Sequence, residues 1–240
     1  DQGAINIAPV IAASPELTDL RFSATRAGSR GSKAIAEALL KCSSLVHLDL
    51  SDNTFGEEGS QVLAQALEQQ TQLQVLNLRD ASLEYEGAKA VIEALKKSGA
   101  PLKVLDMSAN DMTNEIIDDL CDLITANPGL EVVGLEENEL GTDGAKMLAG
   151  VFVDLPNLKE VLLQTNDITA AGAVAVVNAI KDKPITRLEL DGNAICPEGL
   201  ERINAILERA GKSGVLGVME DNDEDGDNDL EEEPDADVDE

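Results

Sequence analysis

The residues whose types and spacing come closest to a chemical site lie near the carboxyl end of the chain. They follow the D-x-D-x-D-G-x5-E spacing of a calcium loop: Asp221, Asp223, Asp225, Gly226 and Glu232. Such a loop needs an amphipathic helix on each side and normally an apolar residue at its eighth position. Asn228 stands at that position, within an acidic run that would match many acidic patterns. We therefore interpret the spacing as accidental and expect no metal site and no cofactor.

Two further patterns lack the partners that their chemistry needs. Gly211, Lys212 and Ser213 resemble the end of a phosphate-binding loop, but Ile206 stands where that motif requires a glycine. His47 is the only histidine, and no second histidine or cysteine pair accompanies it to share a metal. No nucleophile, base and orienting acid can be assembled around it. We expect the chain to have no active site of its own.

The charge of the chain restricts its partners. The formal net charge is -29, and 14 of the 47 acidic residues but none of the 18 basic ones fall in residues 220–240. A chain this acidic repels nucleic acid and anionic lipid unless a local basic patch meets them, and the sequence shows no such patch. No apolar stretch reaches the length of about 18 residues that a membrane helix requires. We expect basic proteins as partners, no nucleic acid and no insertion into a membrane.

Most of the chain before the acidic residues at its carboxyl end consists of a repeated sequence frame. The frame L-x-x-L-x-L-x-x-N fits Leu45, Leu48, Leu50 and Asn53, and it begins again every 27 to 29 residues. Seven copies begin at residues 17, 45, 73, 102, 130, 158 and 185. Alternating apolar residues predict a short strand, and the asparagine carboxamide can satisfy backbone groups where the chain leaves that strand. Each asparagine is therefore expected to be structural first.

The second half of each repeat predicts a helix. A glycine is followed by apolar residues at helical spacing, as in residues 59–67 and 172–180. Helices are wider than strands, so stacked units must curve, with a parallel sheet on the concave face. The sequence predicts an α/β leucine-rich-repeat solenoid, a horseshoe of the ribonuclease-inhibitor type. Strands are expected near residues 20–22, 48–50, 76–78, 105–107, 133–135, 161–163 and 188–190.

The two ends of the solenoid are expected to differ. Residues 1–12 match the helical half of a repeat with no strand before them, so we expect the chain to begin within a repeat of a longer horseshoe, or without a cap. Residues 215–219 could form a last, degenerate strand. The predicted domains are thus a solenoid over residues 1–219 and a disordered acidic tail over residues 220–240. Three cysteines, an odd number, indicate reduced thiols in the cytosol or nucleus.

Charged residues that follow three consecutive strands form the candidate contact surface. Arg26, Arg30, Asp52, Arg79 and Asp80 come from the first three repeats and should cluster as a patch of mixed charge in an acidic body. We expect this patch to contact a partner protein. Because these residues are placed on the rim, truncating Asp52 or Arg79 should weaken binding and leave folding unaffected.

The segment LDLSDNTFGEEG at 48–59 resembles the L-S-D-N-x-F-G signature of Ran GTPase-activating proteins. Segments at 20–31, 76–88 and 189–201 are most similar to the plant branch of that family. Members are horseshoes of long repeats followed by an acidic tail. The resemblance implies that Asp52 and Asn53 match the signature's Asp and Asn, which makes both of them candidate residues for contact with the GTPase. It leaves open whether the copy that acts on the GTPase lies here or in upstream repeats, and no nuclear-envelope targeting domain is found.

The resemblance implies a function. The chain would accelerate GTP hydrolysis on a Ran-type small GTPase, in nucleocytoplasmic transport, by holding the GTPase's own catalytic glutamine in place. We expect a monomer in the cytoplasm, at the nuclear envelope or in the nucleus, which binds the GTPase but activates it poorly without upstream repeats. The alternative is a non-catalytic scaffold or inhibitor, such as a ribonuclease-inhibitor-like protein or the sensor of an immune receptor.

Overall fold

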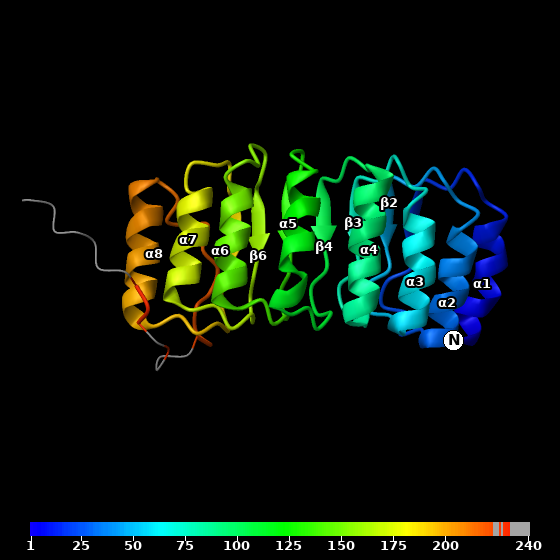
Figure 1. Cartoon of the computed structure of the whole chain (residues 1–240), viewed down its shortest axis with the longest axis horizontal. Helices are drawn as coiled ribbons and strands as arrows, with labels where there is room; N and C mark the ends of the chain where they lie inside the picture. The colour runs from blue at the N-terminus through cyan, green and yellow to red at the C-terminus, as the bar shows by residue number, and fades with distance from the viewer. Residues whose placement is uncertain (223–225, 227, 231–240) are drawn as a thin grey trace, which may run out of the picture.

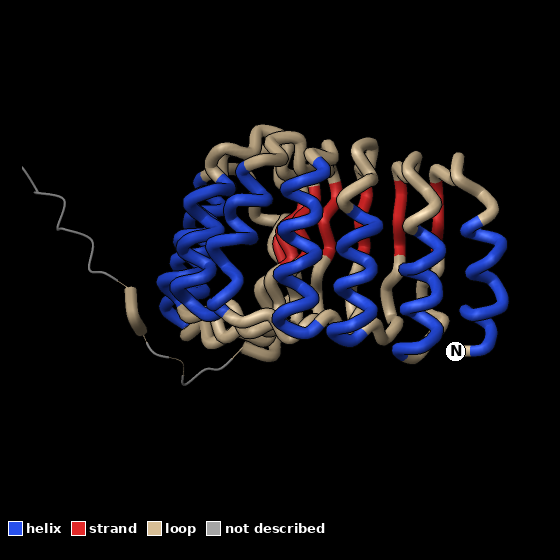
Figure 2. Tube along the Cα trace, turned by 45° about the vertical axis from the view of Figure 1, so that its right-hand side comes forward, coloured by secondary structure: helices blue, strands red, loops and turns tan. Residues whose placement is uncertain are grey.

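The protein is a single row of strand and helix units, seen in a computed structural model that describes residues 1–222, 226 and 228–230. The helices lie side by side on one face and the strands on the other (Figures 1 and 2). The elements are α1 (Gln2–Ala12), β1 (Asp19–Arg21), α2 (Ser29–Leu39), β2 (His47–Asp49), α3 (Gly56–Leu67), β3 (Val75–Asn77), α4 (Glu84–Ser98), β4 (Val104–Asp106), the 3-10 turn η1 (Asn114–Ile116), α5 (Ile117–Thr125), β5 (Val132–Gly134), α6 (Gly141–Phe152), β6 (Glu160–Leu162), α7 (Ala170–Ile180), β7 (Arg187–Glu189) and α8 (Pro197–Arg209).

The strands form one open sheet in chain order, β1 to β7, with every neighbouring pair parallel. This confirms the predicted solenoid. Each strand lies one residue earlier than predicted, and the register stays constant, with Leu48 opposite Leu20 and Leu76. Backbone hydrogen bonds continue past the strand ends, as from Leu50 N to Asn77 O at 2.9 Å. The predicted residues therefore still belong to the pairing.

The core is a continuous layer between the strands and the helices. The central strand residues, such as Leu48, Leu76 and Leu105, have no exposed surface. On the opposite side of the layer, Leu63 and Leu67 of α3 are also fully buried. Burying one leucine side chain contributes about 2 kcal/mol. A layer one residue deep on each side needs aliphatic side chains, which agrees with the scarcity of aromatic residues.

The glycine near the start of the helices allows neighbouring helices to approach closely. A Cβ atom added to Gly87 of α4 would lie 2.4 Å from the Cβ of Ser60 in α3. One added to Gly199 of α8 would lie 2.5 Å from the Cβ of Ala170 in α7. Both distances are too short for carbon atoms in contact. A side chain at either position would force two repeats apart.

The asparagines form a ladder along the turns that follow the strands. Asn110 is 1% exposed, and its amide nitrogen donates to the carbonyls of Leu78, Met107 and Ser108 at 2.8 to 3.1 Å. Its Oδ1 accepts from the backbone of the preceding repeat, at Ala81 N and Leu83 N. Asn53, Asn138, Asn166 and Asn193 donate in the same pattern. The predicted structural role of the asparagines is confirmed.

The ladder continues one step beyond the seven repeats of the sequence frame. Asn222 Oδ1 accepts from Asn193 N at 3.1 Å, as the ladder asparagines do in earlier turns. The segment before it pairs with β7 through a single parallel bridge between Leu188 and Leu216. The expected last strand is therefore reduced to one bridge, and ordered contacts extend into residues 220–222. The remainder of the predicted tail lies largely outside the described residues.

Three members of the calcium-loop pattern, Asp223, Asp225 and Glu232, also lie outside the described residues. The backbone N–H of Asp221 donates to Asp191 Oδ1 at 2.9 Å. Across residues 1–222, 226 and 228–230, no three His, Cys, Asp or Glu side chains are grouped so that they could hold a metal ion. Nor does any helix in this part of the chain combine the length and apolar composition that a membrane crossing requires.

We predict that Asn110→Ala lowers the free energy of unfolding by about 3 kcal/mol, because it leaves several buried backbone groups without a hydrogen-bond partner. Urea denaturation followed by circular dichroism measures this. Asn204→Ala is the matched control, since Asn204 is exposed on α8 and its amide donates to Leu200 O within the same helix. Equal stability of the two variants would contradict a structural role for the ladder.

Candidate functional site

Apart from Arg30, the candidate contact residues lie along one edge of the sheet, in the loops that follow the strands. Backbone hydrogen bonds join these loops: Arg26 N donates to Asp52 O at 3.1 Å, and Asp52 N donates to Arg79 O at 2.9 Å. Asp80 is joined to the second repeat in the same way, by the bond from Asn53 N to Asp80 O at 3.1 Å. The predicted clustering of these loops is thus observed. We call this set of loops the strand-end edge.

The members of the predicted patch are not equally accessible. Arg26 and Asp80 are exposed and Asp52 is half-buried. Arg30 is exposed in the first turn of α2, and no hydrogen bond or ion pair connects it to the other predicted residues in the described part of the chain. The loops of Arg26, Asp52 and Asp80 are therefore adjacent, whereas Arg30 lies in helix α2 and is not bonded to them.

Asn53 is enclosed by the solenoid itself. It is 3% exposed, and its amide donates to the carbonyls of Phe22, Leu50 and Ser51. Its Oδ1 accepts from Thr25 Oγ1 at 2.5 Å and from a backbone N–H. The prediction that Asn53 contacts a partner is therefore corrected, because its side chain is almost completely enclosed. It can affect a contact only by holding the loop of Asp52.

Arg79 makes contacts that the sequence analysis did not anticipate. Its guanidinium reaches over the fourth repeat to the carboxylates of Glu136 and Glu137 in the fifth. The reach is possible because a small residue, Ser108, occupies the same position of the intervening repeat and is buried. Ser108 Oγ also accepts from the backbone N–H of Glu136 at 3.0 Å. We call Arg79, Glu136 and Glu137 the cross-repeat ion cluster.

The cluster is partly shielded from water, and both this burial and the neighbouring charges affect the pKa of Arg79. The side chain of Arg79 is 35% exposed, while that of Glu136 is only 9% exposed. Burial alone lowers the pKa of Arg79, but the hydrogen bond to Glu136 and the charges of Glu136, Glu137 and Asp106 raise it above its ordinary value. Arg79 is therefore committed to an internal partner. We therefore expect its truncation to affect folding, contrary to the expectation from the sequence.

The open face of the sheet beside this cluster is mainly acidic. Asp49, Asp106, Glu160 and Glu189 alternate along their strands with the buried core residues. Arg187, a cation on this face, pairs with Glu189 at 2.8 Å and approaches Glu160 at 3.9 Å. An acidic face of this kind suits a partner that presents basic side chains.

One signal in the sequence could have located the ion cluster. Arg79, Ser108 and Glu136 occupy the same position in three successive repeats, directly after the last buried strand residue. Strands lie about 4.8 Å apart, so residues two repeats apart are separated by about 10 Å, which two long side chains can bridge. Opposite charges at equivalent positions, with a small residue between them, are the pattern to search for.

Strand, turn and helix repeated along an open parallel sheet, with an asparagine in five of the seven turns, define a leucine-rich-repeat fold. A family model described as Leucine Rich repeat matches residues 41–64, which contain β2 and most of α3.

Among proteins of known sequence, the chain is similar to RAN GTPase-activating protein 2 of Arabidopsis thaliana. The two are 36% identical over 134 residues, which are 55% of this chain and 24% of the Arabidopsis protein. The match thus spans about a quarter of that relative's length.

Two solved structures are similar at lower identity. Leiomodin-1 actin-binding site 2 aligns with a TM-score of 0.47 and 21% identity, over 52% of this chain and 75% of that chain. The tropomodulin C-terminal domain of Caenorhabditis elegans aligns with a TM-score of 0.37 and 12% identity, over 88% and 92%. Likeness at this level says nothing of what this chain binds.

We predict that Arg79→Ala lowers the free energy of unfolding by about 1 to 2 kcal/mol, because the nearly buried carboxylate of Glu136 loses its cation. Adding Glu136→Gln to that variant should recover part of the loss. Urea denaturation of both proteins measures the difference. Arg21→Ala is the control, since Arg21 forms an exposed pair with Asp19 and its loss should change stability little. No recovery in the double variant would assign the effect to lost packing.

Proposed function

We propose that this chain binds a Ran-type small GTPase and promotes hydrolysis of its GTP by positioning the GTPase's own catalytic residues. The observation that carries the proposal is the 36% identity to the Arabidopsis RAN GTPase-activating protein 2 over 134 residues. The segment LSDNTFG at 50–56, which holds Asp52, adds to that support.

Three features of the geometry support this proposal. The strand-end edge offers Arg26, Asp52 and Asp80 on adjacent loops, held by a backbone ladder that does not depend on a partner. A partner seated on this edge would also face the acidic strands, so basic residues on the GTPase would find complementary charge. GTP hydrolysis by such GTPases needs a water molecule oriented by a glutamine, and a rigid surface can supply that orientation.

The chain's own role would be regulatory. We propose that it contributes contact surface and no reacting group, that it acts as a monomer, and that it works in the cytoplasm or at the nuclear envelope. The solenoid over residues 1–219 would carry the contact, and the acidic residues after it would belong to a separate segment. These proposals rest on the relative's name and on the repeat architecture.

We predict that the chain binds the GTPase loaded with a non-hydrolysable GTP analogue, and that Asp52→Ala weakens this binding by about 1 to 3 kcal/mol. Isothermal titration calorimetry measures the affinity. The substitution should leave the backbone intact, because Ala109 holds the equivalent position of the fourth repeat with φ 52°, close to the 53° of Asp52.

Thr165→Ala is the matched control, since Thr165 has φ 53° at the same repeat position near the other end of the sheet. Single-turnover GTP hydrolysis, with the Arabidopsis relative as reference, then measures acceleration. Binding without any acceleration would favour the inhibitor or scaffold alternative. Absence of binding would contradict the proposal, and equal losses in the two variants would place the contact elsewhere.

A further inference from the structure

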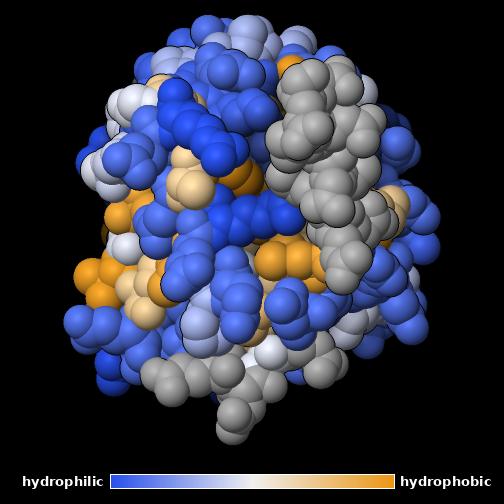
Figure 3. Space-filling view, turned by 90° about the vertical axis from the view of Figure 1, so that its left-hand side faces the viewer, coloured by the Kyte–Doolittle hydropathy of each residue, from blue (hydrophilic) through white to orange (hydrophobic). Residues whose placement is uncertain are grey.

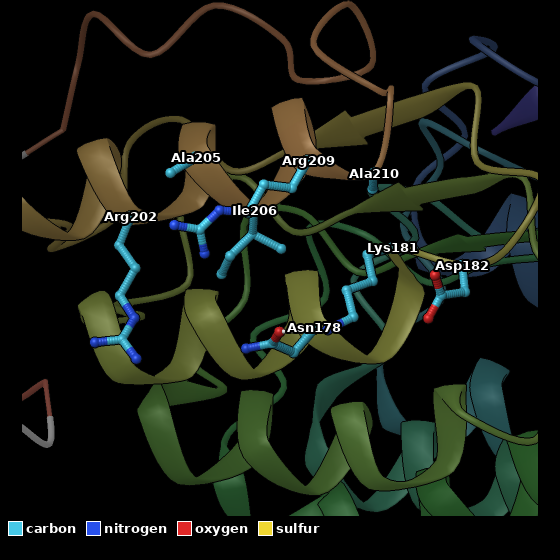
Figure 4. A pocket seen from close by; sticks show the side chains of 8 residues that line it. All are labelled: Asn178, Lys181, Asp182, Arg202, Ala205, Ile206, Arg209 and Ala210. Carbon is cyan, nitrogen blue, oxygen red and sulfur yellow. Dashed lines mark hydrogen bonds between the residues drawn. The ribbon is translucent and has the colours of Figure 1, made fainter. Parts of the chain in front are cut away.

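A groove on the helical face runs between α7 and α8. Its volume is about 570 Å³, and it is lined by Asn178, Lys181, Asp182, Arg202, Ala205, Ile206, Arg209 and Ala210. Figure 4 shows Arg202, Ile206 and Arg209 projecting from α8 toward α7, with Lys181 on the opposite wall. We call it the α7–α8 groove.

The groove gathers positive charge on a strongly acidic molecule. Among the described residues, Lys181, Arg202 and Arg209 line it together with one carboxylate, Asp182. The sequence shows no basic patch, but in the structure three cations that are separated in sequence meet here. Lys181 and Arg209 stand at the carboxyl ends of their helices, where the helix dipole favours cations.

A carboxylate of the chain itself is already seated beside this groove. Asp229 Oδ1 accepts from the backbone N–H of Ala171 at 2.9 Å, and its Oδ2 accepts from Thr169 Oγ1 at 2.5 Å. Both donors belong to the first turn of α7 and its cap. Burial raises the pKa of Asp229, but these hydrogen bonds and the charge of Lys146 outweigh it and lower the pKa. Leu230, the next residue, packs against the core.

The seat of Asp229 and the α7–α8 groove are neighbours. Asp229 lines a smaller hollow of about 330 Å³ together with Lys146, Ala171 and Arg202, and Arg202 also lines the groove. The end of the solenoid that α8 forms is mainly hydrophilic, with only small hydrophobic patches (Figure 3). Contacts on this part of the molecule therefore depend mostly on charge and hydrogen bonds.

We propose that the α7–α8 groove is a binding site for an acidic peptide, and that its occupant is the chain's own carboxyl-terminal segment, residues 231–240, led into it by Asp229 and Leu230. That segment contains Glu231, Glu232, Glu233, Asp235, Asp237, Asp239 and Glu240 and no basic residue. The charge of the occupant is thus opposite to that of the groove.

The lengths are compatible. Helix α7 has 11 residues and is about 16 Å long. The path from the seat of Asp229 at its amino end to Lys181 at its carboxyl end covers about that distance. Ten extended residues can span up to about 35 Å. The segment can therefore pass Arg202 and reach Lys181 and Arg209.

The test attaches a nitroxide spin label to Ala236→Cys in the full-length, nitrogen-15-labelled chain. The native cysteines should not react, because Cys42, Cys121 and Cys196 are 1%, 8% and 2% exposed, and burial, with Asp118 and Asp122, raises the pKa of Cys121 to about 11. We expect the label to broaden the amide signals of residues 178–182 and 203–210. The broadening should disappear at about 0.5 M NaCl, where charges are screened within a few ångströms.

A charge-reversed variant, Lys181→Glu with Arg209→Glu, should also lose the broadening. The matched control is Lys33→Glu with Lys97→Glu, two cations of the same helical face that pair with Glu58 and Glu68. This control should keep it. Broadening that is absent, spread along the solenoid, or unchanged by the α7–α8 reversal would overturn the proposal. A mixture of two chains tests docking on a second copy: one carries nitrogen-15 and no spin label, and the other carries the spin label and no nitrogen-15. Broadening of the signals in this mixture would also overturn the proposal.

Discussion

The constraint on which the whole structure depends is the need to satisfy backbone groups in the turn that follows each strand. These groups are buried between repeats, away from water, and an unpaired buried carbonyl or N–H is costly. The asparagine amide meets this need by donating to carbonyls of its own turn and of the preceding repeat. In the five repeats that carry the asparagine, the turn is thus joined to the preceding repeat. The stack, the constant register and the alignment of the strand-end edge all follow from this dependence.

Most of the fold could be predicted, because its signals are periodic. The apolar residues indicated every strand, and the asparagines indicated five of the seven turns. The strand bounds were wrong by one residue because the last inward-facing residue of each frame continues the hydrogen bonding just beyond the end of the strand. Asn222 was missed since no leucine frame precedes it and acidic residues surround it. Its role depends on a neighbouring repeat being folded, which local composition does not reveal.

The candidate surfaces were less predictable because they depend on which side chains meet across repeats. The clustering of Arg26, Asp52 and Asp80 follows from register alone and was anticipated. The pairing of Arg79 was not, since its partners lie two repeats away. The α7–α8 groove was missed for a related reason: Lys181, Arg202 and Arg209 are spread over some 28 residues, and only the stacking of two helices brings them together. A search for charged surfaces in a solenoid must therefore compare residues at equivalent positions of neighbouring repeats as well as residues that are consecutive in the sequence.

The cross-repeat ion cluster also has a mechanical meaning. In a simple solenoid each repeat contacts only its neighbours, so resistance to bending comes from the interfaces between adjacent repeats. Here the fourth unit has the shortest α-helix described, α5, of nine residues, and its packing against α4 and α6 is less extensive than in most other helix pairs. On the opposite face, Arg79 ties the third unit to the fifth across this softer link. The tie opposes opening of the arc where the outer layer resists it least, and because it is electrostatic, the bending stiffness of the middle of the molecule should vary with ionic strength.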